Sequence, residues 1–394
     1  MSKRRLAYIA IAGLSIAIFC YAAALYVLGS GGDYAEAASI AEGTSNFKEL
    51  SARFEELAKK EGGVYAFEVL KRAKLPPNTD THLLGHVVGD ELYKQKGVDG
   101  IADCTQDFRN ACSHTIVIGA LNEFGGEAAL GLIREACKKA PGGSGAYTMC
   151  YHGLGHGVFA FYGYEFPETV EFCEKTGSKE YREREYVECV GGAVMELMGG
   201  GGHDPEAWQK SREKYLTEAL SPCMDAYIPD EAKSICLIYI TPHIWEAAGI
   251  NMGHPDPEKF RDAFKFCDAI QDVTLRNSCY DGFGKEFPTL ANARDIRDLN
   301  KLSDDALAKV VSWCAMAPER GLEPCTLSAL RSLFWGGEND PNLSFRYCKV
   351  VAEGALQNAC YRDLASQMRQ YFDGARRAEW CPRLPEEARA MCSQ

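Results

Sequence analysis

Five of the eight histidines lie in three stretches in the N-terminal half of the chain. His82 and His86 belong to a His-Leu-Leu-Gly-His run, His114 is the second residue after Cys112, and His152 and His156 belong to Cys-Tyr-His-Gly-Leu-Gly-His-Gly. Two histidines four residues apart share one face of a helix, and neutral imidazole is the commonest metal ligand. The pattern therefore predicts a metal site, with zinc or copper as the ions most compatible with imidazole ligands.

A structural role for these histidines is the main alternative, because a buried imidazole can simply hydrogen-bond a neighbouring carbonyl. In a regular stack, helix axes lie 8–10 Å apart, so His82 and His152 would be ~20 Å from each other unless the array curls tightly. The sequence leaves both interpretations open. Further ligands could come from other side chains, namely Asp90, Glu91, Glu196, His243 and Glu246.

Known catalytic motifs do not account for these residues. The spacing of His82 and His86 matches His-Glu-x-x-His, but Leu83 stands where a zinc peptidase has its general-base glutamate, and Gly153 stands there in the second copy. The chain has no Gly-x-Ser-x-Gly elbow and no phosphate-binding loop. Whether the protein is an enzyme is therefore left open, and a metal-assisted hydrolase or oxidase would need Glu91 or Glu196 as a base.

Sixteen of the seventeen cysteines, all except Cys20, fall in order into eight local pairs. The pairs are Cys104–Cys112, Cys137–Cys150, Cys173–Cys189, Cys223–Cys236, Cys267–Cys279, Cys314–Cys325, Cys348–Cys360 and Cys381–Cys392. An even count with regular spacing behind an export signal predicts disulfides. Zinc sites are the alternative, but no pair has the separation of two to four residues that is typical of them.

The same cysteines mark a repeated unit, in which a helix ends in cysteine, a polar loop follows, and the next helix opens with cysteine. The second cysteines recur every 32 to 47 residues, which is typical of stacked helical hairpins. No sustained alternation of apolar and polar residues indicates a strand. The predicted fold is all-α: one disulfide-stapled array of helical hairpins over residues 45–394, either a tetratricopeptide-like α-solenoid or an α/α ring.

The N-terminus carries the signature of a membrane segment. Lys3, Arg4 and Arg5 precede an apolar stretch from Leu6 to Leu28, which is long enough to cross the ~30 Å hydrocarbon core of a bilayer. The basic end is expected in the cytoplasm. Residues 1–29 are thus predicted as a signal-anchor transmembrane helix, residues 30–44 as a linker, and the rest as extracytoplasmic. A signal peptide cleaved near Ala35-Glu36-Ala37 is the competing interpretation.

Charge excludes one class of partner. The formal net charge is −12, and binding to nucleic acid requires a concentrated basic surface. We therefore expect no nucleic-acid partner.

The Cys-Tyr-His-Gly-Leu-Gly-His-Gly run, with His-Leu-Leu-Gly-His upstream and Cys-Val-Gly-Gly-Ala-Val-Met-Glu downstream, resembles a group of exported prokaryotic Cys/His helical-repeat proteins. The resemblance covers roughly residues 80–290. It implies export and repetition, and it implies no particular activity.

Two functions are expected from these features. The first is transition-metal binding by a membrane-anchored, extracytoplasmic repeat protein. The alternative is a scaffold that binds a protein or peptide along a concave face, as helical solenoids commonly do, without metal or catalysis.

Overall fold

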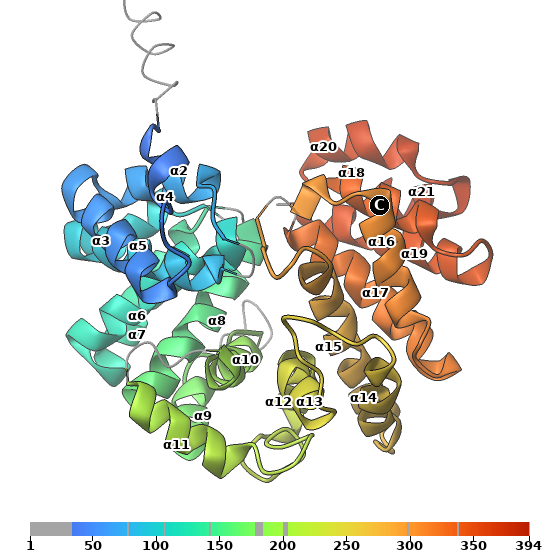
Figure 1. Ribbon diagram of the computed structural model, residues 1–394, viewed down its shortest axis with the longest axis horizontal. Coiled ribbons are helices and arrows are strands. Elements are labelled where there is room, and N and C mark those ends of the chain that lie inside the picture. The colour runs from blue at the N-terminus through green and yellow to red at the C-terminus, as the bar shows by residue number, and fades with distance from the viewer. Residues whose placement is uncertain are drawn as a thin grey trace, which may run out of the picture.

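The computed structural model describes residues 34–76, 79–105, 107–141, 143–177, 184–199, 204–297, 299–336 and 339–393. All regular structure in these ranges is helical, which confirms the all-α prediction (Figure 1). The predicted transmembrane helix, residues 1–29, lies outside the described residues. Within the described ranges, no helix combines the length and the apolar character needed to cross a bilayer.

A series of nine helices forms the centre of the described structure, and each packs on the next. We call it the central series. It consists of α5 (Thr81–Lys96), α6 (Asp107–Phe124), α8 (Gly143–Phe161), α10 (Arg184–Gly199), α12 (Asp230–Tyr239), α15 (Val273–Ala291), α17 (Glu319–Gly336), α19 (Ala355–Tyr371) and α21 (Glu386–Ser393).

The remaining elements pack around the central series (Figure 1). They are α2 (Glu36–Ser39), α3 (Phe47–Glu61), α4 (Gly63–Arg72), η1 (Gly97–Asp103), α7 (Gly126–Lys139), α9 (Phe166–Glu174), α11 (Pro205–Tyr215), α13 (Thr241–Ala247), α14 (Lys259–Asp268), η2 (Leu299–Lys301), α16 (Asp304–Cys314), α18 (Pro341–Val350), α20 (Gly374–Trp380) and η3 (Cys381–Arg383).

The central series curls back on itself. In Figure 1 the chain descends from α3 and α5 through α10 and then rises to α18 and α21, so that its two ends lie on the same side of the molecule. Contacts across the interior accompany this path, because α6 touches α17 and α8 touches α19. Helices that are distant in the sequence therefore face one another across the interior.

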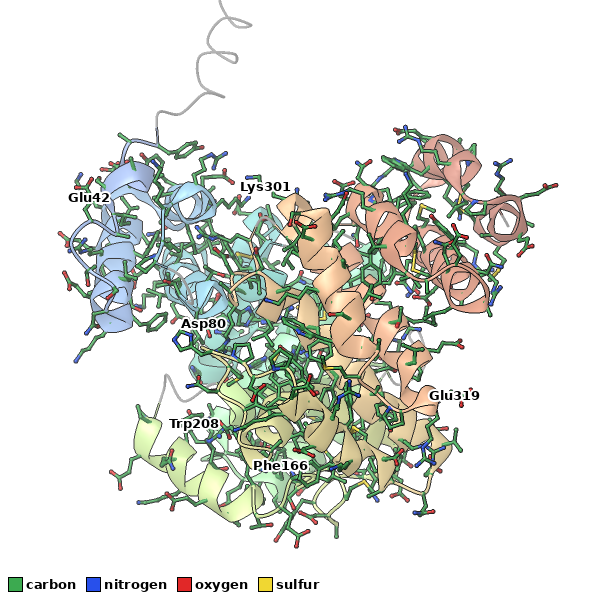
Figure 2. All side chains as sticks on the ribbon, turned by 45° about the vertical axis from the view of Figure 1, so that its right-hand side comes forward. Glu42, Asp80, Phe166, Trp208, Lys301 and Glu319 are labelled. Carbon is green, nitrogen blue, oxygen red and sulfur yellow. A yellow bond between two sulfur atoms is a disulfide. The ribbon has the colours of Figure 1, made fainter. Side chains whose placement is uncertain are left out.

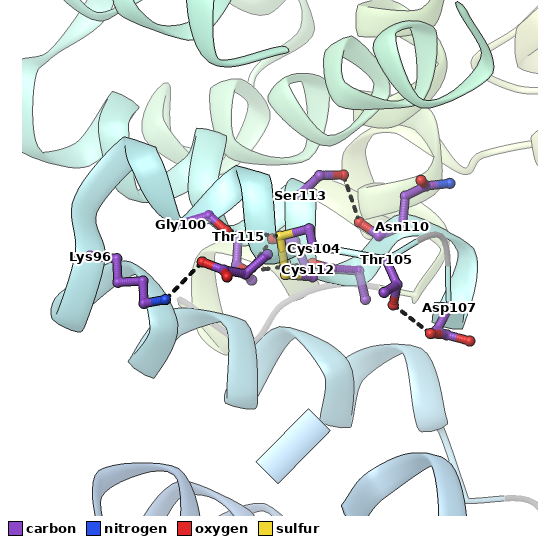
Figure 3. Close-up of a disulfide and its surroundings, with 11 residues drawn as sticks. Lys96, Gly100, Cys104, Thr105, Asp107, Asn110, Cys112, Ser113 and Thr115 are labelled. Carbon is purple, nitrogen blue, oxygen red and sulfur yellow. Dashed lines mark hydrogen bonds and ion pairs between the residues drawn. A yellow bond between two sulfur atoms is a disulfide. The ribbon is translucent and has the colours of Figure 1, made fainter. Parts of the chain in front are cut away.

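All eight predicted cysteine pairs are disulfides, with Cα–Cα separations from 5.3 to 5.7 Å. Figure 3 shows the first, Cys104–Cys112, which ties the end of η1 to α6. Figure 2 shows side chains filling the spaces between helices, with sulfur–sulfur bonds among them. Each bridge closes a short loop and can stabilise the fold by up to about 3 kcal/mol by restricting the unfolded chain.

The central helices begin earlier than the cysteine pattern predicts. We expect each to open at its second cysteine, yet α8 begins at Gly143, well before Cys150, and α15 begins at Val273, before Cys279. For α15 the reason is an N-cap: the Asp272 carboxylate accepts a hydrogen bond from the Leu275 N–H at 2.9 Å. The second cysteine therefore lies inside its helix, and the loop between the two cysteines is shorter than expected.

Glycines let the central helices touch through their backbones. A Cβ atom at Gly155 of α8 would lie 1.9 Å from the Cys189 carbonyl oxygen of α10, and one at Gly192 would lie 1.9 Å from the His152 carbonyl oxygen. In the weaker downstream copy, a Cβ at Gly284 would lie 2.1 Å from the Cys325 carbonyl oxygen. The glycines of the repeated motif thus fix how closely consecutive central helices approach.

Part of the predicted linker packs on the helical domain. Ala37 of α2 is buried, and the Tyr65 hydroxyl of α4 donates a hydrogen bond to the Glu36 carboxylate at 2.7 Å. The Tyr34 and Tyr65 rings lie 5.3 Å apart. Residues 34–40 are therefore in contact with α4.

Two arginines connect the N-terminal helices to α15 and the loop that follows it. Arg297 Nη1 donates to the carbonyl oxygens of Leu70 and Ala73 at 3.2 and 2.7 Å. Arg109 Nη2 of α6 donates to Thr289 Oγ1 of α15 at 2.7 Å. These contacts place α15 beside α6, and the loop after α15 beside the end of α4.

Candidate metal centre

The five predicted histidines converge on one place in the interior. His82 and His86 come from α5, His114 from α6, and His152 and His156 from α8. Neighbouring ring centroids lie 4.6 to 6.2 Å apart. One ligand nitrogen each from His82, His114 and His156 lies within 4.8 Å of the other two. The wide separation expected for a regular stack does not occur, because α5, α6 and α8 pack side by side around the cluster.

Small residues allow this convergence. A Cβ atom at Gly153 of α8 would lie 2.6 Å from the His114 Cα atom of α6, and one at Gly85 of α5 would lie 2.7 Å from the Ala111 Cβ atom. The close approach of α5, α6 and α8 at these glycines brings imidazoles from three helices into one cluster. The glycines between the histidines are therefore part of the site's construction.

His82 is oriented by a backbone carbonyl. Its Nδ1 lies 2.6 Å from the Phe108 carbonyl oxygen, which fixes the tautomer with the proton on Nδ1. Phe108, Arg109 and Asn110 all have left-handed φ angles, from 55° to 63°, a conformation that costs about 1 kcal/mol or more per non-glycine residue. The His82 Nε2 atom is buried and has no hydrogen-bond partner among the described residues.

His156 is oriented by a carboxylate. Its Nδ1 lies 3.0 Å from Glu196 Oε2 of α10, and both side chains are buried. A histidine that ligates a metal commonly donates its other N–H to a carboxylate or a carbonyl. Like His82, His156 has a buried Nε2 without a hydrogen-bond partner among the described residues.

His114 lies in the middle of the cluster and is 1% exposed. Neither of its ring nitrogens has a hydrogen-bond partner in the described part of the chain. Buried polar groups are nearly always hydrogen-bonded, and leaving one unsatisfied costs about 1–3 kcal/mol. His114 is thus the residue of the cluster that a purely structural role explains least well.

His152 and His86 flank the three central histidines. His152 Nε2 lies 3.3 Å from Met195 Sδ, and its Nδ1 lies 3.5 Å from Glu188 Oε2. The His152 ring is 4.8 Å from the Tyr239 ring. His86 is half-buried beside His82, with ring centroids 4.6 Å apart.

Burial lowers the pKa of three imidazoles of the cluster, those of His82, His114 and His152. It lowers the pKa of His82 to about 4, although Asp80 opposes the shift. It lowers the pKa of His152 to about 4, although Glu188 opposes the shift. The pKa of His114 falls well below its usual value because of burial and the four surrounding histidines. Neutral imidazoles carry the lone pairs that a metal ion requires.

Two cavities meet at the cluster. The first, about 200 Å³, is lined by His82, His86 and His156. The second, about 230 Å³, is lined by His82, His114 and His152. The side chains shared by both linings are His82, Arg109, Met195, Tyr239 and Lys285. A small molecule in either cavity could therefore reach an ion held by the histidines.

The donor set fits a transition metal. It consists of three converging imidazole nitrogens, two of them on rings whose other nitrogen is held by a carbonyl or a carboxylate. Catalytic zinc sites keep three protein ligands and leave a further position for water or substrate. His82, His114 and His156 can hold such an ion, with the cavities on its open side.

The other candidate ligands have different partners. Glu91 pairs with Lys94. His243 and Glu246 line the first cavity, but His243 Nε2 lies 2.9 Å from the Glu218 carbonyl oxygen and Glu246 pairs with Arg212 at 2.9 Å. Asp90 lies outside both linings. Of the predicted carboxylates, Glu196 is the one in contact with a histidine of the cluster.

Several residues at the site were missed by sequence reasoning, although the repeats contain a signal for some of them. His114 and His152 are second after the second cysteine of their repeats, and His156 is sixth. The same two offsets in later repeats give further residues of the cavity linings: Met195, Ile238, Pro242, Asp281, Lys285 and Arg331. Aligning the repeats on their cysteines would have found these residues. Arg109, Glu188 and Tyr239 have no such signal.

No family model, no curated protein and no solved structure matches this chain. The interpretation of the site therefore rests on its own geometry.

Proposed function

We propose that the protein binds a transition metal ion, zinc or copper, through His82, His114 and His156, with His86 and His152 beside the ion. The observation that carries this proposal is the convergence of buried ring nitrogens that lack hydrogen-bond partners in the described structure. Coordination would satisfy these nitrogens, whereas a purely structural role would leave them unpaired at a cost of about 1–3 kcal/mol each.

The arrangement around the histidines supports the same proposal. The Phe108 carbonyl and the Glu196 carboxylate each hold one nitrogen of a histidine, as the outer ligands of metal sites do. A bound ion would polarise a ligand that enters from either cavity. The chain's own contribution is then to orient the imidazoles and to limit access to a small molecule.

The wider setting is part of the proposal. We infer that the central series is an array of helical hairpins that curls tightly, with the metal site on its inner, concave side. The eight disulfides favour an oxidising compartment outside the cytoplasm. The apolar stretch from Leu6 to Leu28, after three basic residues, favours a single-pass membrane anchor with a cytoplasmic N-terminus.

The test is elemental analysis of the disulfide-intact full chain, purified and then exposed to zinc or copper. We expect about one equivalent of metal that resists dialysis. The double variant His82→Ala plus His156→Ala should lose it, because only one of the three converging ligands remains. His254→Ala is the matched control: His254 is exposed in a loop outside both cavity linings, and this variant should keep its metal. Folded wild-type protein that takes up neither metal would refute the proposal.

Binding of a protein or peptide is the second candidate, and one observation favours it. The second cavity has an apolar side that includes Met149, Ile235, Ile238 and Trp335, and Trp335 is 42% exposed. Aromatic side chains of this kind often anchor a partner. If the chain binds no metal, Trp335→Ala should weaken binding of a peptide partner and leave the fold intact.

A further inference from the structure

Two cations lie at the junction of the two cavities with one carboxylate near them. Lys285 of α15 pairs with Glu286, and its Nζ lies 4.7 Å from the centre of the Tyr239 ring. Arg109 of α6 donates to Thr289 Oγ1 at 2.7 Å. Among the described residues, no carboxylate oxygen lies within 4 Å of the Arg109 guanidinium.

The three charges interact with one another. Burial and the nearby Arg109 lower the pKa of Lys285, although Glu286 opposes the shift. Burial alone would raise the pKa of Glu286, but Lys285 and Arg109 together bring it below its usual value. Arg109 therefore acts electrostatically on both members of the pair. Of these three charged groups, two are cations and one is a carboxylate.

The other arginines that line the cavities either pair with a carboxylate or are exposed to solvent. Arg331 pairs with Asp363 at 3.0 Å, and Arg212 pairs with Glu246 at 2.9 Å. Arg294 is exposed to solvent at the first cavity, where water screens its charge. Arg109 is the half-buried arginine that lines both cavities without a carboxylate partner within 4 Å in the described structure.

We propose that Arg109 and Lys285 bind a small oxyanion, a carboxylate or phosphate group, at the junction of the two cavities beside the histidines. The planar guanidinium offers paired N–H donors that match two oxygens of such a group, and Lys285 adds a point charge. Cavities of about 200 and 230 Å³ limit the ligand to a small molecule. Contact between the bound anion and a metal ion rests on the proposed function. The anion site itself rests only on Arg109 and Lys285.

The test uses inorganic phosphate and acetate as probes, titrated by calorimetry into the full chain in a chloride buffer, with and without zinc. We expect at least one probe to bind with a Kd of about 1 mM or tighter. Arg109→Gln should weaken that binding tenfold or more, and Arg109→Lys, which keeps the charge but loses the paired donors, should fall between. Binding of phosphate alone or of acetate alone identifies which oxyanion the site prefers.

Arg294→Gln is the matched control, since it removes the same charge from an exposed position of the first cavity. It should change the Kd by no more than about twofold. Absence of binding of both probes to wild-type protein, or equal binding by Arg109→Gln and wild type, would overturn the proposal.

Metal content, measured on the same samples, separates the two proposals. If the chain takes up no metal but binds the probe through Arg109, the oxyanion site stands and the metal proposal fails. If metal is bound and probe binding does not depend on Arg109, the oxyanion proposal alone fails.

Discussion

Asp281 is the second residue after Cys279, the position that His114 and His152 hold after their own cysteines. Its carboxylate lies 3.9 Å from Arg331 Nη1, and Arg331 is already paired with Asp363. Burial raises the pKa of Asp281 from 3.8 to about 6; Arg331 opposes this shift and Asp363 adds to it. Where His114 and His152 stand in earlier repeats, this repeat therefore has a half-buried carboxyl group, and ionising it costs folding free energy.

This shift makes stability depend on pH. Because the folded chain holds the Asp281 proton more tightly than the unfolded chain, Asp281 destabilises the fold as pH rises from about 4 to about 6. Asp281→Asn cannot ionise. Relative to wild type, we expect this variant to gain about 1–3 kcal/mol of unfolding free energy between pH 4 and pH 7. Denaturant unfolding at both pH values, with the disulfides intact, measures the gain.

Asp262→Asn is the control for this prediction. Asp262 is exposed, and its hydrogen bond with Lys265 lowers its pKa rather than raising it. The control should gain no stability over wild type as pH rises. If the unfolding free energies of Asp281→Asn and wild type differ by the same amount at pH 4 and pH 7, ionisation of Asp281 does not destabilise the fold and the prediction fails.

At the residue scale, the histidines and Glu196 could be predicted because rare residue types at helical spacing are a local signal. Arg109 could not be predicted. Its importance comes from a left-handed turn and from its position opposite Lys285, and neither feature is written in neighbouring residues. Such contacts between distant segments become visible only in the folded chain.

At the scale of the helices, close packing of α8 on α10 depends on Gly155. A Cβ atom there would lie 1.9 Å from the Cys189 carbonyl oxygen and 3.0 Å from the Ala193 backbone nitrogen. Since both neighbours are backbone atoms, the helices would have to separate. We expect Gly155→Ala to lower the unfolding free energy by about 1–3 kcal/mol, as overpacked cores do. It should also weaken metal binding, because His156 and Glu196 pair across this contact.

Gly131→Ala is the matched control, because Gly131 is an exposed helical glycine of α7 with nothing within 4 Å of an added Cβ atom. That change should raise stability by about 0.5–1 kcal/mol through helix propensity. Thermal and denaturant unfolding of both variants provide the comparison. A Gly155→Ala protein as stable as Gly131→Ala would disprove the tight backbone contact.

The disulfide pairs and some helix starts also have local signals in the sequence. Paired cysteines and capping residues are local signals, and the predicted disulfide pairing is correct in full. The start of α5 has a local signal of the same kind, because the Asp80 carboxylate accepts a hydrogen bond from the Leu83 N–H. Where a helix starts ahead of its cysteine, as α15 does, the cap at Asp272 decides the boundary. The cysteine pattern carries no information about that cap.

For the whole molecule, the path of the central series could not be predicted from the sequence. Curling depends on contacts such as Arg109 with Thr289, which are 180 residues apart, and Arg297 with Leu70, which are 227 residues apart. No periodic pattern encodes such pairs. The estimate of a wide gap between the histidines of α5 and α8 was wrong for a more local reason, because glycines let α5, α6 and α8 pack closely around the cluster.

Arg297 tests the contact between the loop after α15 and the N-terminal helices. Its guanidinium is bound by Asp295 and donates to the carbonyl oxygens of Leu70 and Ala73. Arg297→Ala removes the donors, and we expect a loss of about 1–3 kcal/mol together with faster hydrogen–deuterium exchange at residues 70–76 and 290–297. Metal content should stay unchanged, because α5, α6 and α8 supply all the proposed ligands. Oxyanion binding should weaken, because it requires α6 and α15 to face each other.

Arg346→Ala provides the control, since Arg346 also bonds a backbone carbonyl and a carboxylate, those of Leu302 and Asp304, but both lie in the C-terminal part of the chain. Its effect on exchange should be confined to the neighbourhood of residues 302–304. If Arg297→Ala leaves exchange at residues 70–76 as slow as in wild type, other contacts hold the loop after α15 against the N-terminal helices. Faster exchange there, accompanied by weaker oxyanion binding and intact metal binding, would show that the curl of the central series assembles the cavities, whereas three neighbouring helices build the histidine cluster on their own.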